Sequence, residues 1–311
     1  MKNLKKVLSL VLALAMALSL MTAAFAADAS DYKDYSKVTY KEAVDVMTAA
    51  GIFNGGDGNN FNPDATLNRE QAAKIITYML VGQTQADKLT TTIAPYSDVA
   101  ATNRWSAGAI AYCTNEGILA GDGNGRFNPT APVLGTQFAK MLLVALGYDP
   151  QIEQLVGNSW AINTSKLALG DADLDKGMEE ISLSAALTRE QAAQMAFNAM
   201  QATLVEYEDN GGKIELPGGI VIVTDPSKAT PVTSKVKADA TNISDDTVVM
   251  NGGDVYTVEF AEKYCKDLKL KSSTGHMMQL TDKWSYKSAT IGEYMTAPDA
   301  VAVVDDTDKT I

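Results

Sequence analysis

The sequence predicts a multidomain protein in which an all-α region of three helix-loop-helix units precedes a β-rich domain. Apolar residues recur at helical spacing through roughly the first two hundred positions, within a segment that repeats itself. Runs of β-branched residues separated by turn residues follow, beginning near residue 220. Once residues 1–26 are set aside, 285 of the 311 residues remain, which suffices for two domains.

Residues 1–26 are expected to be a secretory signal peptide. Three lysines near the start precede an uncharged apolar run at 7–20, and Ala24 and Ala26 form the small-residue pattern of a cleavage site. A membrane anchor is the rival interpretation, but the run is shorter than the roughly 20 residues that span a bilayer. We therefore expect cleavage after Ala26. No later run is long and apolar enough to span, so the mature chain is expected to lack membrane contact.

The charge balance argues against two classes of partner. The formal net charge is −12, and it becomes −15 when the three lysines of residues 1–26 are removed. Nucleic acids and anionic membrane surfaces are bound through Lys and Arg, so neither is expected as a partner. Cys113 and Cys265 could pair in an oxidising compartment, although Cys113 falls on an apolar helical face where a buried thiol fits equally well.

A repeat organises the first two hundred residues. A shift of 66 positions aligns residues 43–82 with 109–148, with about a third of the positions identical. A third, looser copy appears at Leu187–Ala193, where LTREQAA restates the LNREQAA of Leu67–Ala73. Such self-similarity indicates stacked copies of one supersecondary unit.

Each copy begins with a helix. In the first copy, Tyr40, Ala43, Val44 and Met47 form one apolar helical face, and Gly51 stands where a helix end requires positive φ. The second copy repeats the pattern at Ala109, Ile110, Cys113 and Gly117.

A loop rich in Gly, Asn and Asp follows each first helix. It reads NGGDGNN in one copy and AGDGNGR in the other, and an F-N-P triplet closes both. We expect Phe61 and Phe127 to plug the loop onto the core. The loops lack the Lys and Ser/Thr of a phosphate-binding P-loop and the ligand spacing of an EF-hand, so they are interpreted as turns.

The second helix of a copy starts at a capping residue. Asn68 and Thr188 are good N-caps, and Gln71 and Gln191 stand three residues on, as in a capping box. One helix-loop-helix unit is too small to bury its own apolar faces, so three units are expected to pack together.

Taken together, these residues resemble the S-layer homology family. Its pattern is an aromatic-x-Asp-Val opening, a Trp before a helix, a Gly-Ile-x-x-Gly loop, an F-x-P triplet and a T-R-x-E-like helix start. The second copy contains Tyr96-Ser97-Asp98-Val99, Trp105, Gly117-Ile118-Leu119-Ala120-Gly121 and Phe127-Asn128-Pro129. The third contains Trp160 and Thr188-Arg189-Glu190-Gln191. The resemblance covers roughly residues 30–207, within a tandem array.

The resemblance implies an all-α pseudo-threefold assembly of modules at 27–82, 92–148 and 149–207, the last divergent. Its grooves would bind secondary cell-wall polysaccharide, often through a pyruvate ketal on an amino sugar. The expected function is therefore non-covalent anchoring of an exported protein to the bacterial cell wall. The protein would act there as an S-layer or surface-associated protein, with copies of itself as a further partner.

By resemblance, the glycan-binding residues are Arg69, Arg189, Asp98, Trp105 and Trp160. An Arg fork makes two parallel hydrogen bonds to a carboxylate, and in the first helical turn it lies near exposed N–H groups and the positive dipole end. Trp offers a sugar a flat apolar face and one N–H donor. Plainer interpretations stay open: helix capping for the T-R-E-Q run, core packing for the tryptophans, and helix orientation for Asp98.

No copy of the pattern is complete. Lys37 lies near the position of the missing opening Asp in the first copy, and Thr39 replaces the Trp. The second copy has Gly135 and Thr136 where an Arg is expected, and the third lacks the F-x-P loop. Fewer working grooves than modules are therefore expected.

The capping residues and the arginines are expected to have separate roles. Replacing Arg69 or Arg189 by Lys should weaken glycan binding with little change in stability, because Lys keeps the charge but loses the fork. An Arg at Gly135 should be tolerated. The helical segment 27–207 alone should bind wall polysaccharide.

The C-terminal region changes character after a polar boundary at 206–212. Short strands are predicted at Ile220–Val223, Thr247–Met250, Val255–Val258 and Val301–Val304. They form a β-rich domain at 213–311, which could be incomplete because the sequence stops shortly after the last run. No ligand signature is present in it.

A wall-anchored hydrolase or adhesin with its activity in the C-terminal region is the alternative function. The chain has one histidine, His276, in a polar segment, and no Cys/His cluster. We therefore expect neither catalysis nor a bound metal or cofactor.

Overall fold

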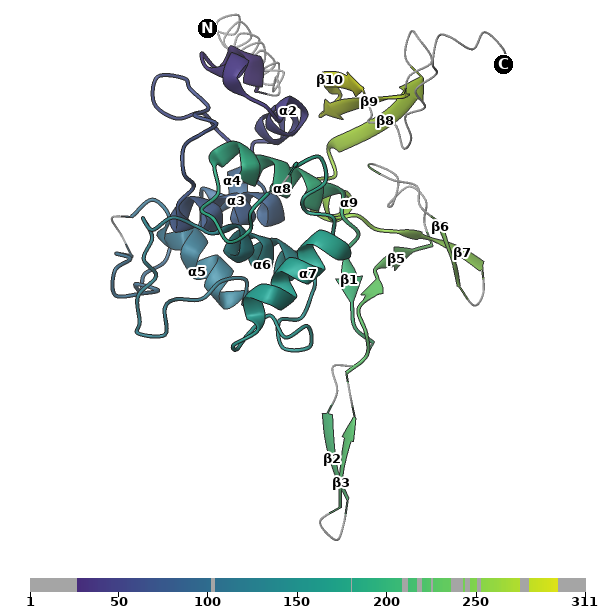
Figure 1. Ribbon diagram of the computed structural model, residues 1–311. Helices are drawn as coiled ribbons and strands as arrows, with labels where there is room; N and C mark the ends of the chain where they lie inside the picture. Colours follow the sequence, from purple (N-terminus) through teal and green to yellow (C-terminus); the bar gives the residue numbers. More distant parts are fainter. Residues whose placement is uncertain are drawn as a thin grey trace, which may run out of the picture.

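The computed structural model describes residues 27–101, 104–179, 181–208, 212–216, 220–224, 226–235, 243, 247–250, 253–274 and 280–295. A helical region is followed by a region of small antiparallel sheets, as predicted (Figure 1). The predicted signal peptide, His276 and the run at 301–304 lie outside the described residues. Among the residues that are described, none of the helices has the length and hydropathy needed to cross a membrane.

Seven α-helices are described in the helical region. They are α2 (Lys41–Ala49), α3 (Arg69–Val81), α4 (Gln83–Ala86), α5 (Ala107–Asn115), α6 (Gly135–Ala145), α7 (Trp160–Gly170) and α8 (Arg189–Gln201). Two 3₁₀ turns precede them, η1 (Ala29–Asp31) and η2 (Tyr35–Lys37).

The helix ends follow the sequence signals. Capping boxes formed by Asn68 with Gln71 and by Thr188 with Gln191 open α3 and α8. Gly51 follows α2 with φ 72°, a conformation that is strained for a residue with a Cβ but not for glycine. Phe61 and Phe127 are fully buried, which confirms that they plug the loops onto the core.

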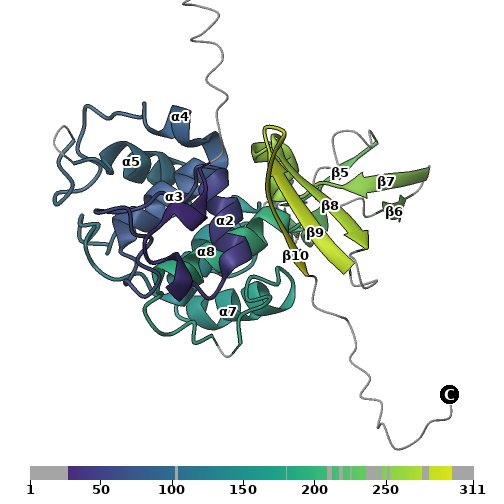
Figure 2. The same cartoon turned by 90° about the horizontal axis from the view of Figure 1, so that it is seen from above.

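The helices pack across the boundaries of the repeat. The second helix of one unit lies against the first helix of the next, so that α3 contacts α5 and α6 contacts α7. The last helix, α8, returns to contact the first, α2 (Figure 2). Each unit therefore buries its apolar faces mainly against its neighbours, and the cycle closes on itself.

A ring of three backbone hydrogen bonds lies at the centre of this cycle. The Leu67 N–H donates to the Leu187 carbonyl at 2.9 Å, and the Val133 N–H donates to the Leu67 carbonyl at 2.9 Å. The Leu187 N–H donates to the Val133 carbonyl at 3.1 Å and completes the ring. All three side chains are buried, so the segments before α3, α6 and α8 meet in the core.

In the part of the C-terminal region that the structure describes, there are ten short strands and one helix. The strands are β1 (Val205–Glu206), β2 (Gly212–Leu216), β3 (Ile220–Thr224), β4 (Thr230–Pro231), β5 (Thr233–Ser234), β6 (Thr247–Met250), β7 (Gly253–Thr257), β8 (Leu268–Thr274), β9 (Leu280–Tyr286) and β10 (Ala289–Met295). The helix α9 (Phe260–Tyr264) lies between β7 and β8. The predicted runs beginning at Ile220, Thr247 and Val255 fall on β3, β6 and β7, which confirms them as strands.

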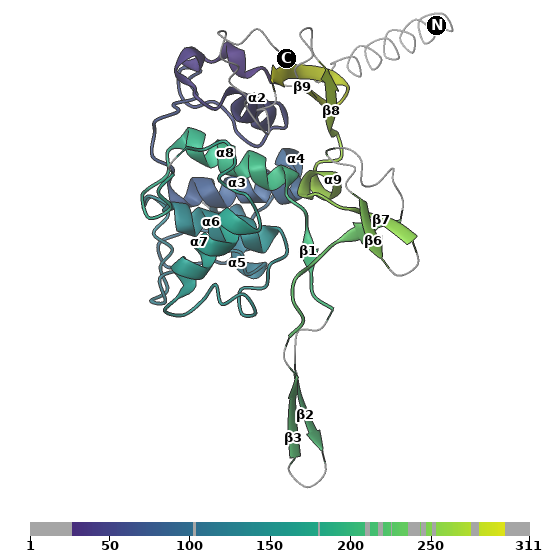
Figure 3. The same cartoon turned by 45° about the vertical axis from the view of Figure 1, so that its right-hand side comes forward.

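The strands form several small sheets, all with antiparallel pairs. The orders are β1-β4, β2-β3, β5-β7-β6 and β10-β9-β8. The β2–β3 hairpin extends away from the helices (Figure 1 and Figure 3). The β8–β10 sheet lies beside α2 and continues the protein core.

Trp284 of β9 holds this sheet against the helices. It is 1% exposed, its ring packs edge-on against Phe197 of α8 at 5.3 Å, and its Nε1–H donates to Glu42 of α2 at 2.7 Å. Tyr294 of β10 donates to Asp45 of α2 at 2.6 Å. The sheet therefore bridges α2 and α8, the two helices whose contact closes the cycle.

Candidate functional site

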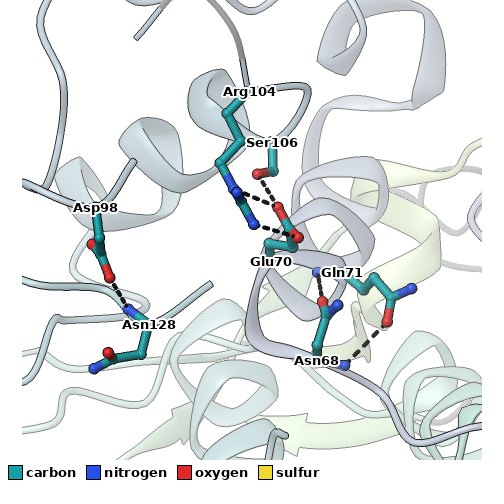
Figure 4. Close-up of polar contacts among 7 residues, drawn as sticks. All are labelled: Asn68, Glu70, Gln71, Asp98, Arg104, Ser106 and Asn128. Atoms are coloured by element: carbon teal, nitrogen blue, oxygen red, sulfur yellow. Dashed lines mark hydrogen bonds and ion pairs between the residues drawn. The ribbon is translucent and has the colours of Figure 1, made fainter. Parts of the chain in front are cut away.

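Asp98 holds the F-N-P triplet of the second copy. Its two carboxylate oxygens accept hydrogen bonds from the backbone N–H groups of Phe127 and Asn128, each at 2.8 Å. Figure 4 shows the bond to Asn128. Asn128 has φ 57°, in the left-handed region, and the Tyr96 ring stacks on Phe127 at 5.5 Å. Asp98 thus fixes the loop between α5 and α6.

The first copy contains the same clamp, which corrects one sequence prediction. Asp34, and not Lys37, occupies the opening Asp position, because it accepts from the N–H groups of Phe61 and Asn62 at 2.7 Å each. Asp34 and Asp98 are 64 residues apart, whereas the repeat was aligned at 66, so the gapless register places Tyr32 opposite Asp98 and leaves Asp34 unmatched. A two-residue length difference before the first helix displaces the motif.

The Asp98 clamp predicts an acid-dependent loss of stability. Burial raises the pKa of Asp98, but the backbone donors of Phe127 and Asn128 outweigh burial and hold it below the ordinary value. The ionised group therefore stabilises the fold above the unfolded pKa of about 3.9, and this contribution is lost as the pH falls through the depressed folded value. Asp98→Asn should lower the free energy of unfolding at pH 7, and its deficit relative to the unaltered protein should shrink at strongly acid pH.

Urea unfolding at pH 7 and at strongly acid pH measures this deficit. Asp57→Asn, at an exposed loop position, is the matched control and should change little at either pH. If Asp98→Asn lowered the free energy of unfolding by the same amount in acid as at pH 7, the ionised Asp98 carboxylate would not be what holds the loop.

The two predicted arginines hold loops of neighbouring units. Arg69 donates from Nε to the Phe127 carbonyl and from Nη2 to the Ala120 carbonyl, both at 2.9 Å, and it lies 4.6 Å from the centroid of the Phe127 ring. Arg189 donates from Nε to the Phe61 carbonyl at 2.9 Å and from Nη2 to the Asn54 carbonyl. Because each fork bonds two backbone carbonyls, we now expect Arg69→Lys and Arg189→Lys to cost some stability, whereas the sequence alone predicted little change.

The starts of α3 and α8 are not open to an anion, which corrects the expectation of exposed N–H groups there. The N–H groups of Arg69 and Glu70 donate to the Ala131 and Pro129 carbonyls at 3.0 Å each. Those of Arg189 and Glu190 donate to Ala65 and Pro63 at 2.8 and 3.1 Å. With the next N–H bound by the cap residue, the first-turn donors are already paired within the protein.

Two buried glutamates in the helix-capping runs, Glu70 and Glu190, also hold segments of neighbouring units. Glu70 is 5% exposed and accepts both donors of the Arg104 fork, at 2.7 and 2.8 Å, and the Ser106 hydroxyl at 2.6 Å (Figure 4). Glu190 accepts the Thr39 N–H at 2.8 Å. Each glutamate therefore holds the segment before the next unit's first helix. The sequence signal for this role was that a glutamate stands at the same position in both R-E-Q runs.

Gly135 shows why the second copy has no arginine. A Cβ at this position would lie 2.7 Å from the Leu183 Cα and 2.9 Å from its carbonyl oxygen. The expectation that Arg would be tolerated there is therefore wrong, because the chain approaches too closely for any side chain.

A cavity of about 280 Å³ brings two of the predicted site residues together. Arg69 and Trp160 line it, together with Gln137 and Lys140 of α6. Its apolar lining includes Ile118, Leu119, Met141, Leu155 and Val156. The Lys140 Nζ lies 5.8 Å from the centroid of the Trp160 ring, and burial lowers the pKa of its ammonium.

The other predicted site residues lie outside this cavity. Arg189 and Asp98 hold loops, as described above, and Trp105 is 58% exposed on the surface. Lys140 and Gln137 were missed by the sequence analysis, although Gln137 and Lys140 recur at the positions of Gln71 and Lys74 in the repeat. The arrangement combines a cation, an amide and an indole face, which suits a polar ligand with an anionic group and flat apolar surfaces.

Comparison with known proteins shows a family match in two segments. The family model for the S-layer homology domain matches residues 31–73 and 95–139. A surface layer protein of Brevibacillus choshinensis is 27% identical over 215 residues, 69% of this chain and 18% of that protein. A cell surface protein of Thermoanaerobacter kivui is 32% identical over 150 residues, 48% of this chain and 19% of that protein.

A middle cell wall protein of Brevibacillus brevis is similar over a comparable stretch. It is 28% identical over 212 residues, 68% of this chain and 19% of that protein. This chain thus covers less than a fifth of the length of these three relatives. Within the described residues, no group of three or more His, Cys, Asp or Glu side chains could hold a metal ion.

Proposed function

We propose that this chain, in which two segments match the S-layer homology domain, anchors itself non-covalently to the bacterial cell surface by binding secondary cell-wall polysaccharide. The observation that carries this proposal is the cavity where Arg69, Lys140 and Trp160 meet. Residues of three successive units line it, so the ligand would be bound by the assembled helical region and not by a single unit. The relatives' names, which refer to surface and cell wall proteins, support this location.

The chemistry of the cavity favours a sugar that carries a carboxylate, such as a pyruvate ketal. Two of the five guanidinium donors of Arg69 are bound to carbonyls, so an end-on approach to the Nη groups is the route left for a carboxylate. Lys140 supplies a second positive charge, and Trp160 supplies a flat face for the sugar ring. Partial burial strengthens both charge interactions relative to water.

We further infer that the helical region consists of three modules, of which residues 149–207 form a divergent third. The three-membered backbone ring and the pairing of α8 with α2 support this inference. In this arrangement Trp105 remains a proposed glycan contact because its ring is accessible. Arg189 and Asp98 are proposed as positioning residues that shape the loops.

Lys140→Gln and Trp160→Ala should each weaken binding to wall sacculi that retain their polysaccharide. Loss of a charge-assisted hydrogen bond costs about 1.5–3 kcal/mol, so Lys140→Gln should bind at least about tenfold more weakly. Co-sedimentation of the whole mature chain measures the affinity. Lys166→Gln, on an exposed position of α7, makes the same charge change and should bind as the unaltered protein does.

Removal of pyruvate from the sacculi by mild acid tests the ligand chemistry. Binding should be largely lost, and Lys140→Gln should then have no further effect. Equal affinities for the Lys140 and Lys166 variants would contradict the proposed site, and undiminished binding to stripped sacculi would contradict the carboxylate.

A further inference from the structure

A second cavity, of about 530 Å³, lies between the helical region and the C-terminal region. Its helical wall comes from the end of α2, from α3 and from α4. The opposite wall comes from the end of α9, the segment before β8 and the β9–β10 turn. It shares none of its lining residues with the Arg69–Trp160 cavity.

The charge of this cavity is opposite to that of the chain. Its charged lining residues are Lys263, Lys266, Lys287 and Asp267, whereas the whole chain carries −12. Three lysines against one aspartate give an excess of two positive charges in an acidic protein. Such a local excess raises the concentration of anions at the cavity.

Two of the lysines are held in place by the fold. Lys287 begins a two-residue turn between β9 and β10, and with Ser288 it has positive φ, 48° and 68°. This conformation is that of the tight hairpin turn, which fixes the direction of the backbone. The Lys287 and Lys263 ammonium groups each lie 5.1 Å from a tyrosine ring centroid, those of Tyr286 and Tyr264.

The helical wall supplies neutral polar groups. Thr48 of α2 is 1% exposed and lines the cavity, and its buried hydroxyl oxygen has no hydrogen-bond partner among the described residues. Gln83 also lines the cavity, and its amide donates to the Asn54 side chain at 3.4 Å. Asn54 is in turn bound through its carbonyl by Arg189.

We propose that this cavity binds an oligoanion, a ligand that carries several carboxylates or phosphates. Lys263, Lys266 and Lys287 would each face an anionic group, and Gln83 would donate a hydrogen bond from the opposite wall. Cleavage after Ala26 would add the α-amino group of Ala27, which also lines the cavity. The proposal goes beyond wall anchoring at Arg69 and Trp160, because it assigns a different cavity that exists only where the C-terminal region docks.

The test is titration of the whole mature chain with two soluble probes, hexagalacturonate for carboxylates and polyphosphate of similar charge for phosphates. The variant Lys263→Gln, Lys266→Gln, Lys287→Gln should bind the preferred probe at least tenfold more weakly. Its affinity should also depend less steeply on salt, by about one unit of log–log slope for each lost contact. The control Lys166→Gln, Lys271→Gln, Lys283→Gln makes the same charge change at exposed positions outside the cavity.

Each outcome decides the proposal. Weaker binding of one probe by the cavity variant, with the control within twofold of the unaltered protein, supports it and identifies the anionic group. Equal losses in both variants would show a general charge effect, and no loss, or no binding of either probe by the unaltered protein, would overturn it. Thermal melts confirm that both variants fold. Because the probes are free in solution, the result is independent of the sacculus experiment.

Discussion

Trp284→Ala is expected to lower the free energy of unfolding by about 3–5 kcal/mol, the cost of truncating a fully buried aromatic side chain. Trp284 is 1% exposed and packs against Phe197, so its removal leaves a cavity between the sheet and α8. The variant also leaves Glu42 without its indole donor. Burial raises the pKa of Glu42 while that hydrogen bond lowers it, so loss of the bond should raise this pKa further.

Denaturant unfolding followed by circular dichroism measures the loss. Trp105→Ala is the matched control, because Trp105 is 58% exposed and its truncation should change stability by less than about 0.5 kcal/mol. If the two variants were equally stable, the sheet would not be part of the folded core. By the same reasoning, a fragment of residues 27–207 should be less stable than the whole chain, since it lacks Trp284 and Tyr294.

Gly135→Arg should destabilise the protein by at least the upper end of the about 1–3 kcal/mol typical of overpacking. Its Cβ would fall 2.7 Å from the Leu183 Cα, and backbone cannot move aside as the end of a flexible side chain can. The N–H of Gly135 also donates to the Ala185 carbonyl at 2.9 Å, so any displacement weakens a buried bond.

Gly170→Arg provides the comparison for this prediction. Gly170 ends α7, and no atom lies within 4 Å of a Cβ placed there. Thermal melting should show a large drop for the Gly135 variant and little change for the Gly170 variant. Similar melting temperatures for the two would mean that the segment at Leu183 adjusts freely.

Local signals in the sequence predicted the helices well. Capping residues, positive-φ glycines and apolar spacing depend on near neighbours, so Asn68, Thr188 and Gly51 could be interpreted without a structure. The packing of helices across the unit boundaries could not be predicted, because the same apolar face fits a helix of its own unit or of the next. Nor did any local pattern indicate that Trp284 packs on α2 and α8, more than eighty residues away along the chain.

The sequence predicted some of the residues of the candidate site but not what each of them contacts. Arg69 and Trp160 were chosen from their motifs and do line one cavity. The motifs did not indicate that two donors of Arg69 form hydrogen bonds to backbone carbonyls. Lys140 was missed because a helical Lys carries no distinctive signal until its neighbours are known. Asp34 was overlooked, and the opening Asp was predicted to be missing, because a gapless alignment cannot represent a difference in length.

The backbone ring of Leu67, Val133 and Leu187 constrains how such a chain can change its number of repeats. Each member donates one bond and accepts one, so loss of a single member would leave one buried donor and one buried acceptor unpaired, at roughly 1–3 kcal/mol for each group. A fourth member inserted in tandem would have to open a closed circle. In the proposed three-module arrangement, growth or loss by one unit is therefore disfavoured, and a gene of this kind would be expected to duplicate its units as a complete set of three.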